Sequence, residues 1–263
     1  MTEKPYIGIT GPTSKEEVNL IVNEFHRAGF TLDSQHIPML GFLVSYKTLN
    51  DIPADNLRYP GFADISELLQ QTNNQVFTTV HYNTKNKDNL ANEVSRVFNG
   101  IYQDDLCKGI QLNLVWPSLD QVQQIKKQFP EMKIIFQANH KVLSSGTPQE
   151  VAKEIKKYQD DISYLLIDPS GGKGEEFDMD DSIEIYKRLR EQTPNLAIGF
   201  AGGFSGRNVE SRLQTMTNKI QTQDFSIDAE GGLRDKLSLV YGDDLLNSQK
   251  VSAYLQNASK VLK

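Results

Sequence analysis

The stretch that decides the fold runs from residue 165 to residue 174 and reads Leu165-Leu166-Ile167-Asp168-Pro169-Ser170-Gly171-Gly172-Lys173-Gly174. An apolar run ends in a carboxylate, and a glycine-rich loop follows at once. This order predicts a buried strand that delivers an acid to a loop where the backbone can approach a ligand closely. Two similar units follow, Ile198-Gly199-Phe200-Ala201-Gly202-Gly203 and Phe225-Ser226-Ile227-Asp228-Ala229-Glu230-Gly231-Gly232. We therefore expect the three strand ends to form one shared site that includes a phosphate-binding position.

The rest of the chain repeats the same alternation of apolar strands and amphipathic helices. The predicted strands are Tyr6–Thr10, His36–Val44, Gln75–His81, Gly109–Leu114, Lys133–Ala138, Tyr164–Asp168, Leu196–Ala201 and Phe225–Ala229. A helix is expected after each strand, the first opening with the capping-box pair Ser14 and Glu17 and the last running from Asn247 to about Val261. Eight such units predict a single (β/α)8 barrel, a TIM barrel, that takes up residues 1–263 as one domain.

An open doubly wound sheet is the alternative fold. Such sheets usually carry a G-x-G-x-x-G fingerprint after the first strand, and Gly8-Ile9-Thr10-Gly11-Pro12 lacks that spacing. The closed barrel is therefore the preferred prediction. The segment Ser45–Gly61 is the least regular, and we expect it to form a long loop that can act as a flap.

Composition limits the classes of partner. The net charge of −6, without a dense basic run, disfavours nucleic acid. No apolar run reaches the roughly 18 residues of a membrane helix, and the start of the chain does not read as a signal peptide, so a cytoplasmic protein is expected. Cys107 is the only cysteine, which excludes an intrachain disulfide. No His, Asp or Glu cluster has metal-ligand spacing, and no cofactor is predicted. Monomer and homodimer both stay open.

Chemistry in a barrel is expected where the strands end. Asp168 is a candidate general acid there, with an N-cap or loop-stabilising role as the alternative. His81 and His140 are candidate proton carriers, although a lone histidine near a strand end is more often a loop residue without function. Gly202, Gly203, Gly231 and Gly232 follow the seventh and eighth strands, where barrels often seat a phosphate on backbone N–H groups. Asp228 is a candidate to hold a sugar hydroxyl or to cap a turn.

Several of these motifs, taken in order, make the chain resemble the phosphoribosylanthranilate isomerase family. The matching stretches are Ile7-Gly8-Ile9-Thr10-Gly11-Pro12, Leu40-Gly41-Phe42, Ile110-Gln111-Leu112-Asn113, Asp168 with the loop that includes Gly172, Ala201-Gly202-Gly203-Phe204, and Asp228 through Gly232. The resemblance implies a barrel of the ribulose-phosphate-binding type. It also implies an acid–base rearrangement of a ribosylamine to an amino-ketose, with Asp168 at the position of the family's acid.

This chain departs from the family at residues that matter. Ile7 stands where the family has its catalytic cysteine base, and an alkyl side chain cannot carry protons. Asn113 replaces a histidine, and Arg58 is the candidate to replace an arginine that meets the substrate carboxylate. Glu230 and Gly231 stand where the phosphate turn has serines.

Three functions follow as hypotheses. The first is a diverged, isomerase-like enzyme that acts on a phosphorylated sugar or ribotide, with Asp168 as acid and His81 or His140 as the second proton carrier. The second is a genuine phosphoribosylanthranilate isomerase with a replaced base. The third is a catalytically silent protein that binds a phosphorylated metabolite.

Overall fold

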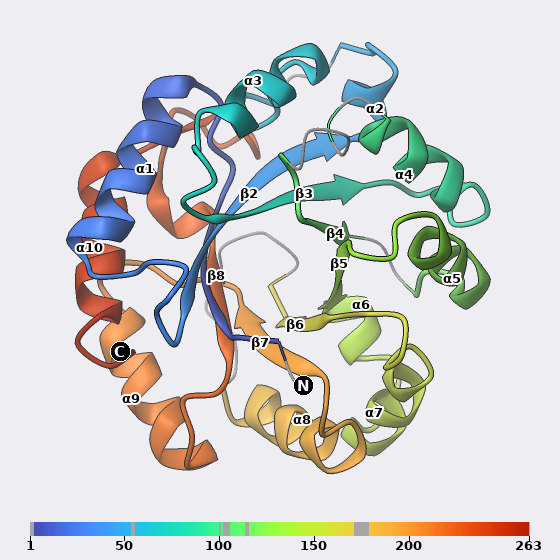
Figure 1. Cartoon of the computed structure of the whole chain (residues 1–263). Coiled ribbons are helices and arrows are strands. Elements are labelled where there is room, and N and C mark those ends of the chain that lie inside the picture. Colours follow the sequence, from blue (N-terminus) through green and yellow to red (C-terminus); the bar gives the residue numbers. More distant parts are fainter. Residues whose placement is uncertain are drawn as a thin grey trace.

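The computed structural model describes residues 3–53, 56–99, 101, 106–113, 116–170 and 179–262. Its centre is a closed barrel of parallel strands in the order β1 to β8 (Figure 1). The strands are β1 Tyr6–Thr10, β2 Ile37–Ser45, β3 Phe77–Asn83, β4 Gly109–Asn113, β5 Lys133–Asn139, β6 Tyr164–Asp168, β7 Ala197–Ala201 and β8 Ser226–Ala229. Pairing of Ile7 with Ile227 closes the ring. The prediction of a (β/α)8 barrel is confirmed, and the open sheet is excluded.

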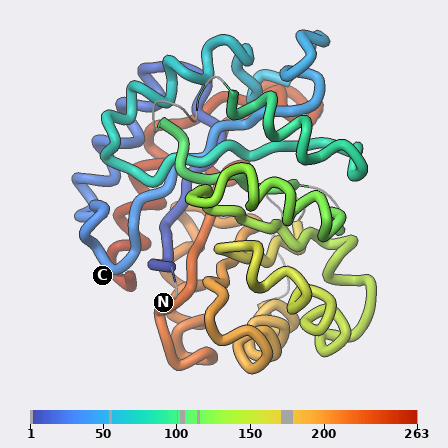
Figure 2. Tube along the Cα trace, turned by 45° about the vertical axis from the view of Figure 1, so that its right-hand side comes forward, coloured from blue at the N-terminus to red at the C-terminus, as the bar shows by residue number. Residues whose placement is uncertain are grey.

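Helices surround the barrel on its outside (Figure 1). They are α1 Lys15–Arg27, α3 Ile65–Gln70, α4 Leu90–Phe98, α5 Leu119–Gln128, α7 Pro148–Lys156, α8 Met179–Gln192, α9 Val209–Ile220 and α10 Ser248–Ala258. The last helix lies beside the first, which completes the ring (Figure 2). Ser14 caps α1 as predicted, but Glu17 accepts from the backbone N–H of Thr13 at 2.6 Å and does not close a capping box.

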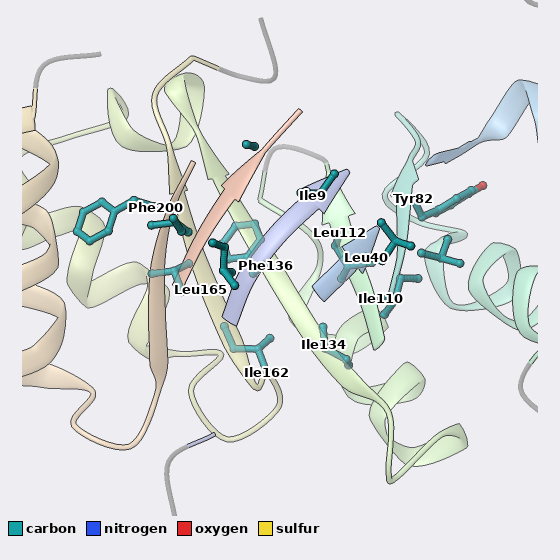
Figure 3. Close-up of a cluster of buried hydrophobic side chains, with 14 of the residues drawn as sticks. Ile9, Leu40, Tyr82, Ile110, Leu112, Ile134, Phe136, Ile162, Leu165 and Phe200 are labelled. Carbon is teal, nitrogen blue, oxygen red and sulfur yellow. The ribbon is translucent and has the colours of Figure 1, made fainter. Parts of the chain in front are cut away.

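The outward faces of the strands form the main core, against the helices. Phe200 on β7 points toward α8, where its ring lies 5.4 Å from that of Tyr186, and Ile9, Leu40 and Leu165 belong to the same buried cluster (Figure 3). Burial of an aliphatic side chain of this kind contributes about 1.5–3 kcal/mol. Because strand side chains alternate, the residues between these apolar positions point into the barrel.

The barrel interior has two different halves. Its amino-terminal half is apolar, built by Tyr6, Met39, Phe77, Ile135, Tyr164, Leu166 and Ala197. The rings of Tyr6 and Tyr164 meet edge to face at 5.2 Å. The carboxyl-terminal half carries buried polar side chains, among them Thr10, His81, Gln111, Gln137, Asp168 and Asp228. Polar groups on the interior strand positions therefore place the site at the carboxyl-terminal end.

Several short elements were not predicted from the sequence. They are α2 Tyr46–Leu49, η1 Phe62–Asp64, α6 His140–Leu143, η2 Gly231–Leu233 and the antiparallel hairpin of β9 Arg234–Lys236 and β10 Asp244–Leu246. The predicted strand end at Leu114 lies outside the described residues, and β4 is described to Asn113. The hairpin matters most, because it lies between β8 and α10 and contributes side chains to the pocket described below.

The segment Ser45–Gly61 is more ordered than the long loop that we expected. Ser45 and Thr48 form a capping box that opens α2. Further on, the backbone N–H of Leu57 donates to the carbonyl of Gly242 in the hairpin at 3.0 Å. The described part of this segment is thus fastened to the hairpin at the mouth of the barrel.

Among the described residues, no helix is both long and apolar enough to cross a membrane.

Candidate active site

A pocket of about 320 Å³ opens at the carboxyl-terminal end of the barrel. Its lining comes from the strand ends and from the hairpin: Leu43, Tyr59, His81, Asn83, Gln111, Asn113, Gln137, Asp168, Ser170, Ala201, Gly202, Gly203, Asp228, Glu230, Gly231 and Tyr241. Eight of the residues singled out in the sequence meet here. They are His81, Asn113, Asp168, Gly202, Gly203, Asp228, Glu230 and Gly231.

Asp228 is the penultimate residue of β8 and is 6% exposed. The Thr10 hydroxyl lies 3.1 Å from both of its carboxyl oxygens and donates to the group. A Cβ on Gly8 would lie 2.7 Å from Asp228 Oδ1, so only glycine leaves room for this carboxyl beside β1. Burial, followed by repulsion from Glu230, raises the pKa of Asp228 to about 7, against the hydrogen bond from Thr10. Asp228 therefore exchanges a proton readily near neutral pH.

Asp168 ends β6 and is 1% exposed. It accepts hydrogen bonds from the side-chain amide of Gln137, from the Ser170 backbone N–H at 3.1 Å and from the Ser170 hydroxyl at 2.8 Å. The contacts with Ser170 hold the start of the loop after β6, and Asp168 also lines the pocket. Asp168 and Asp228 also repel each other, since Asp168 contributes to the raised pKa of Asp228.

The negative charge of Glu230 is offset by an ion pair with Arg58, which lies far away in the sequence. Arg58 contacts Glu230 at 2.5 Å and Asp244 of β10 at 2.5 Å, and Arg234 contacts Asp244 at 2.6 Å. The Arg58 guanidinium also lies 4.6 Å from the centre of the Tyr241 ring. Burial would raise the pKa of Asp244, but the hydrogen bonds from Arg58 and Arg234 outweigh it and hold the pKa below its ordinary value. Arg58 thus fastens the hairpin over the pocket.

The two histidines do not fit the predicted role of proton carrier. His81 Nδ1 lies 3.4 Å from Thr10 Oγ1 and Nε2 lies 3.1 Å from Thr79 Oγ1, so both ring nitrogens are engaged inside the barrel. Burial lowers the pKa of His81 to about 3, which makes it a poor base at neutral pH. His140 is exposed at the start of α6 and is absent from the lining of the pocket.

Some of the predicted glycines line the pocket, whereas Gly232 allows close packing of two loops. Gly202 and Gly203 adopt positive φ values of 102° and 64° beside the pocket. A Cβ on Gly232 would overlap the carbonyl oxygen of Phe204, so this glycine lets the loops after β7 and β8 touch. Gly232 also lines a second pocket, together with Ser205, Arg207, Asn247 and Lys250. Gly172 lies outside the described residues.

The structure corrects the alignment of Ile7 with the family's catalytic cysteine. Gly8 and Thr10 point into the barrel toward Asp228, so Ile7 points outward and is fully buried against the helices. The side chain of β1 that reaches the pocket chemistry is therefore Thr10, and residue 7 does not face the site.

Sequence reasoning missed Gln111, Gln137, Arg234, Tyr241 and Asp244. The two glutamines interrupt apolar strands at inward-facing positions, and this period-two signal marks them as interior polar residues. The other three belong to the hairpin, which reads as a polar connection in the sequence. Among the described residues, no group of three His, Cys, Asp or Glu side chains is placed to hold a metal ion.

Comparison with protein-family models and with curated sequences finds no match. Solved structures do match. A phosphoribosyl anthranilate isomerase from Thermus thermophilus is similar with a TM-score of 0.62 at 12% identity, over 97% of this chain and 98% of that chain. TrpF from Jonesia denitrificans gives 0.58 at 16% identity, over 98% of each chain.

A further match carries a different activity. A truncated 3-deoxy-D-arabino-heptulosonate 7-phosphate synthase from Thermotoga maritima gives a TM-score of 0.58 at 12% identity, over 98% of this chain and 87% of that chain. At these identities the likeness shows the barrel fold alone, because one fold supports many chemistries. Function has to be inferred from the pocket.

Proposed function

We propose that the protein is an acid–base enzyme that isomerises a small, phosphorylated, sugar-like metabolite in the pocket at the carboxyl-terminal end of the barrel. The observation that carries the proposal is the pair of buried carboxyl groups that line that pocket on either side of β7, Asp168 on β6 and Asp228 on β8. Their surroundings differ, and carboxyl pairs in different surroundings take different roles in proton transfer.

Asp228 is the group that we propose to move a proton. With a pKa of about 7 it is available in both protonation states near neutrality. It can remove a proton from a carbon next to a carbonyl or imine and return it to the neighbouring carbon. Asp168, whose oxygens accept hydrogen bonds from Gln137 and Ser170, would act on the substrate oxygen or nitrogen. This division moves part of the role predicted for Asp168 to Asp228 and needs neither histidine.

The lining supports a polyhydroxylated substrate. Imidazole, amide and carboxyl side chains from β3 to β6 face the pocket, and of the strand residues that line it only Leu43 and Ala201 are apolar. Such a surface offers many hydrogen bonds and little apolar contact, which suits a sugar better than a hydrophobic ligand.

We place the phosphate at Gly203 and Gly231. Both residues line the pocket, and no described residue accepts a hydrogen bond from either backbone N–H. Free N–H groups of this kind bind anions. Glu230 stands beside this seat, but its ion pair with Arg58 offsets its charge.

Isotope exchange tests the proposal. The protein is incubated with aldose and ketose phosphates of three to six carbons in deuterated water, and deuterium on carbon is followed by NMR. Exchange that depends on Asp228 supports an isomerase. Binding without exchange would favour the silent binder, and rescue of a tryptophan auxotroph lacking the isomerase would favour the genuine phosphoribosylanthranilate isomerase.

A further inference from the structure

The interior of the barrel contains a short chain of side-chain amides that ends at the proposed site. Gln111 Nε2 donates to Gln137 Oε1 at 3.1 Å, and Gln137 Nε2 donates to Asp168. All three side chains are buried, with exposed fractions of 3%, 4% and 1% for Gln111, Gln137 and Asp168. They come from the neighbouring strands β4, β5 and β6.

The direction of this chain is fixed by its carboxylate end. An ionised carboxylate can only accept hydrogen bonds, so Gln137 must present its NH2 group to Asp168. Its Oε1 then faces Gln111, and Gln111 must in turn present its own NH2 group. The amide oxygen of Gln111 is thereby left at the far end of the chain, and a flip of either amide would oppose two acceptors.

That oxygen has no partner. Gln111 Oε1 is buried, and no residue of the described structure donates a hydrogen bond to it. His81 is opposite Gln111 in the register of β3 and β4, but its two ring nitrogens are engaged with Thr10 and Thr79. A buried acceptor without a donor is a costly arrangement that native proteins seldom keep without a purpose. Gln111 also lines the pocket, where a ligand can supply the donor.

We propose that Gln111 determines substrate specificity by accepting a hydrogen bond from the ligand, so that the ligand enters the barrel with hydrogen-bond donors foremost. The proposal rests on the site assigned above and adds the polarity of its substrate. Gln111, Asp168 and Asp228 together present acceptors at the inner end of the pocket. A hydroxyl-rich end complements them, because a hydroxyl can donate to Gln111 and can either donate to Asp228 or accept from it, whereas a carboxylate or phosphate at this depth would oppose the acceptor oxygen of Gln111. The anionic end of the ligand therefore lies outward, toward Gly203 and Gly231.

Two small probes separate the possible donors. Anhydroribitol is a neutral ring that carries only hydroxyl donors, and iminoribitol has the same ring with a protonated amine. Their binding is measured by calorimetry on the full chain, without any turnover. We expect both to bind, and binding of iminoribitol alone would identify an ammonium group as the donor that Gln111 accepts.

Two variants test the residue itself. Gln111→Met removes the acceptor and should weaken probe binding about tenfold, the change expected for one hydrogen bond. Gln111→Glu keeps an acceptor oxygen and can donate its acid proton to Gln137, so it should bind within about threefold of the wild type. Gln123→Met on the outside of α5, where Gln123 bonds Asp161 at the surface, is the matched control and should bind normally.

Equal binding by Gln111→Met and the wild type would overturn the proposal, as would failure of both probes to bind the wild type. If Gln111→Met does not fold, NMR of the wild type provides the test. The side-chain amide carbon of Gln111 should change its chemical shift when Oε1 accepts a hydrogen bond from the probe, and an unchanged shift would contradict the proposal. The binding test is independent of the proposed function. If the probes bind through Gln111 but the isotope-exchange experiment shows no exchange, the role of Gln111 stands and the proposed role of Asp228 falls.

Discussion

Arg58 contacts Glu230 at 2.5 Å although 172 positions separate the two residues in the chain. This ion pair gives Glu230 a cation, whereas the Asp228 carboxyl, two residues earlier, accepts hydrogen bonds from neutral groups, the Thr10 hydroxyl and the Ala229 backbone N–H. Glu230, just after β8, is thereby held in a network with the hairpin, whereas Asp228 on β8 stays outside the described ion pairs and is the group that we propose to move a proton.

Replacing Asp228 by Asn is expected to reduce isotope exchange on the substrate by at least about a hundredfold, because general acid–base catalysis typically contributes that much. Substrate binding should persist, since an amide still fits the space beside Gly8. Asp120→Asn on the exposed surface of α5 is the matched acid-to-amide control. Exchange by Asp228→Asn at the wild-type rate would remove Asp228 from the mechanism.

The pKa of Asp228 also predicts how stability depends on pH. The folded protein holds this proton up to about pH 7, whereas the unfolded chain releases it near 3.8. The stabilisation is therefore full below pH 4 and is lost as the pH rises through 7. Relative to wild type, Asp228→Asn should gain stability over this window, approaching about 4 kcal/mol. Urea denaturation at several pH values measures the difference, and a difference that does not change with pH would contradict the raised pKa.

The network around Asp244 should be essential for the hairpin. Asp244→Asn removes the carboxylate that both Arg58 and Arg234 contact, and loss of one partner of a buried ion pair typically costs about 3–5 kcal/mol. Glu184→Gln is the control, since Glu184 pairs with Arg188 on the surface of α8 and such pairs contribute about 0–1 kcal/mol. Equal midpoints in urea for the two variants would show that the hairpin does not depend on this network.

Gly232 should tolerate no side chain. Gly232→Ala drives a methyl group into the carbonyl of Phe204, and overpacking of this kind costs about 1–3 kcal/mol. Gly146→Ala is the comparison, because its Cβ meets the side chain of Glu150, which can shift at the cost of its bonds to Thr147, and not backbone, so it should destabilise less than Gly232→Ala. Thermal unfolding of both variants tests this, and a harmless Gly232→Ala would mean that the two loops are free to separate.

The barrel could be predicted from the sequence because its signal is repeated. Each strand is a short apolar run, each is followed by a helical pattern, and eight repetitions leave few alternatives. The strand-end acids Asp168 and Asp228 followed from the same reasoning, since the fold puts every carboxyl-terminal strand end on one face.

The chemistry of individual groups was less accessible. His81 looked like a proton carrier because its residue type suits the task, but the depth of its burial depends on the register of β3 against its neighbours. Ile7 was aligned with a catalytic position by its distance from a glycine, and only the inward direction of Gly8 and Thr10 shows that it faces the helices. The partners of Arg58 were hidden because the hairpin that carries Asp244 has no strong pattern of its own.

Closure of the barrel by β1 and β8 has a consequence for synthesis. The strand that completes the ring is the last of the eight to leave the ribosome, so β1 keeps an open edge while almost the whole barrel is already made. The partners of Arg58, Glu230 and Asp244, are also synthesised only after β8. Nascent chains with open strand edges aggregate readily, and this protein is expected to need shielding by chaperones until β8 has emerged and paired with β1.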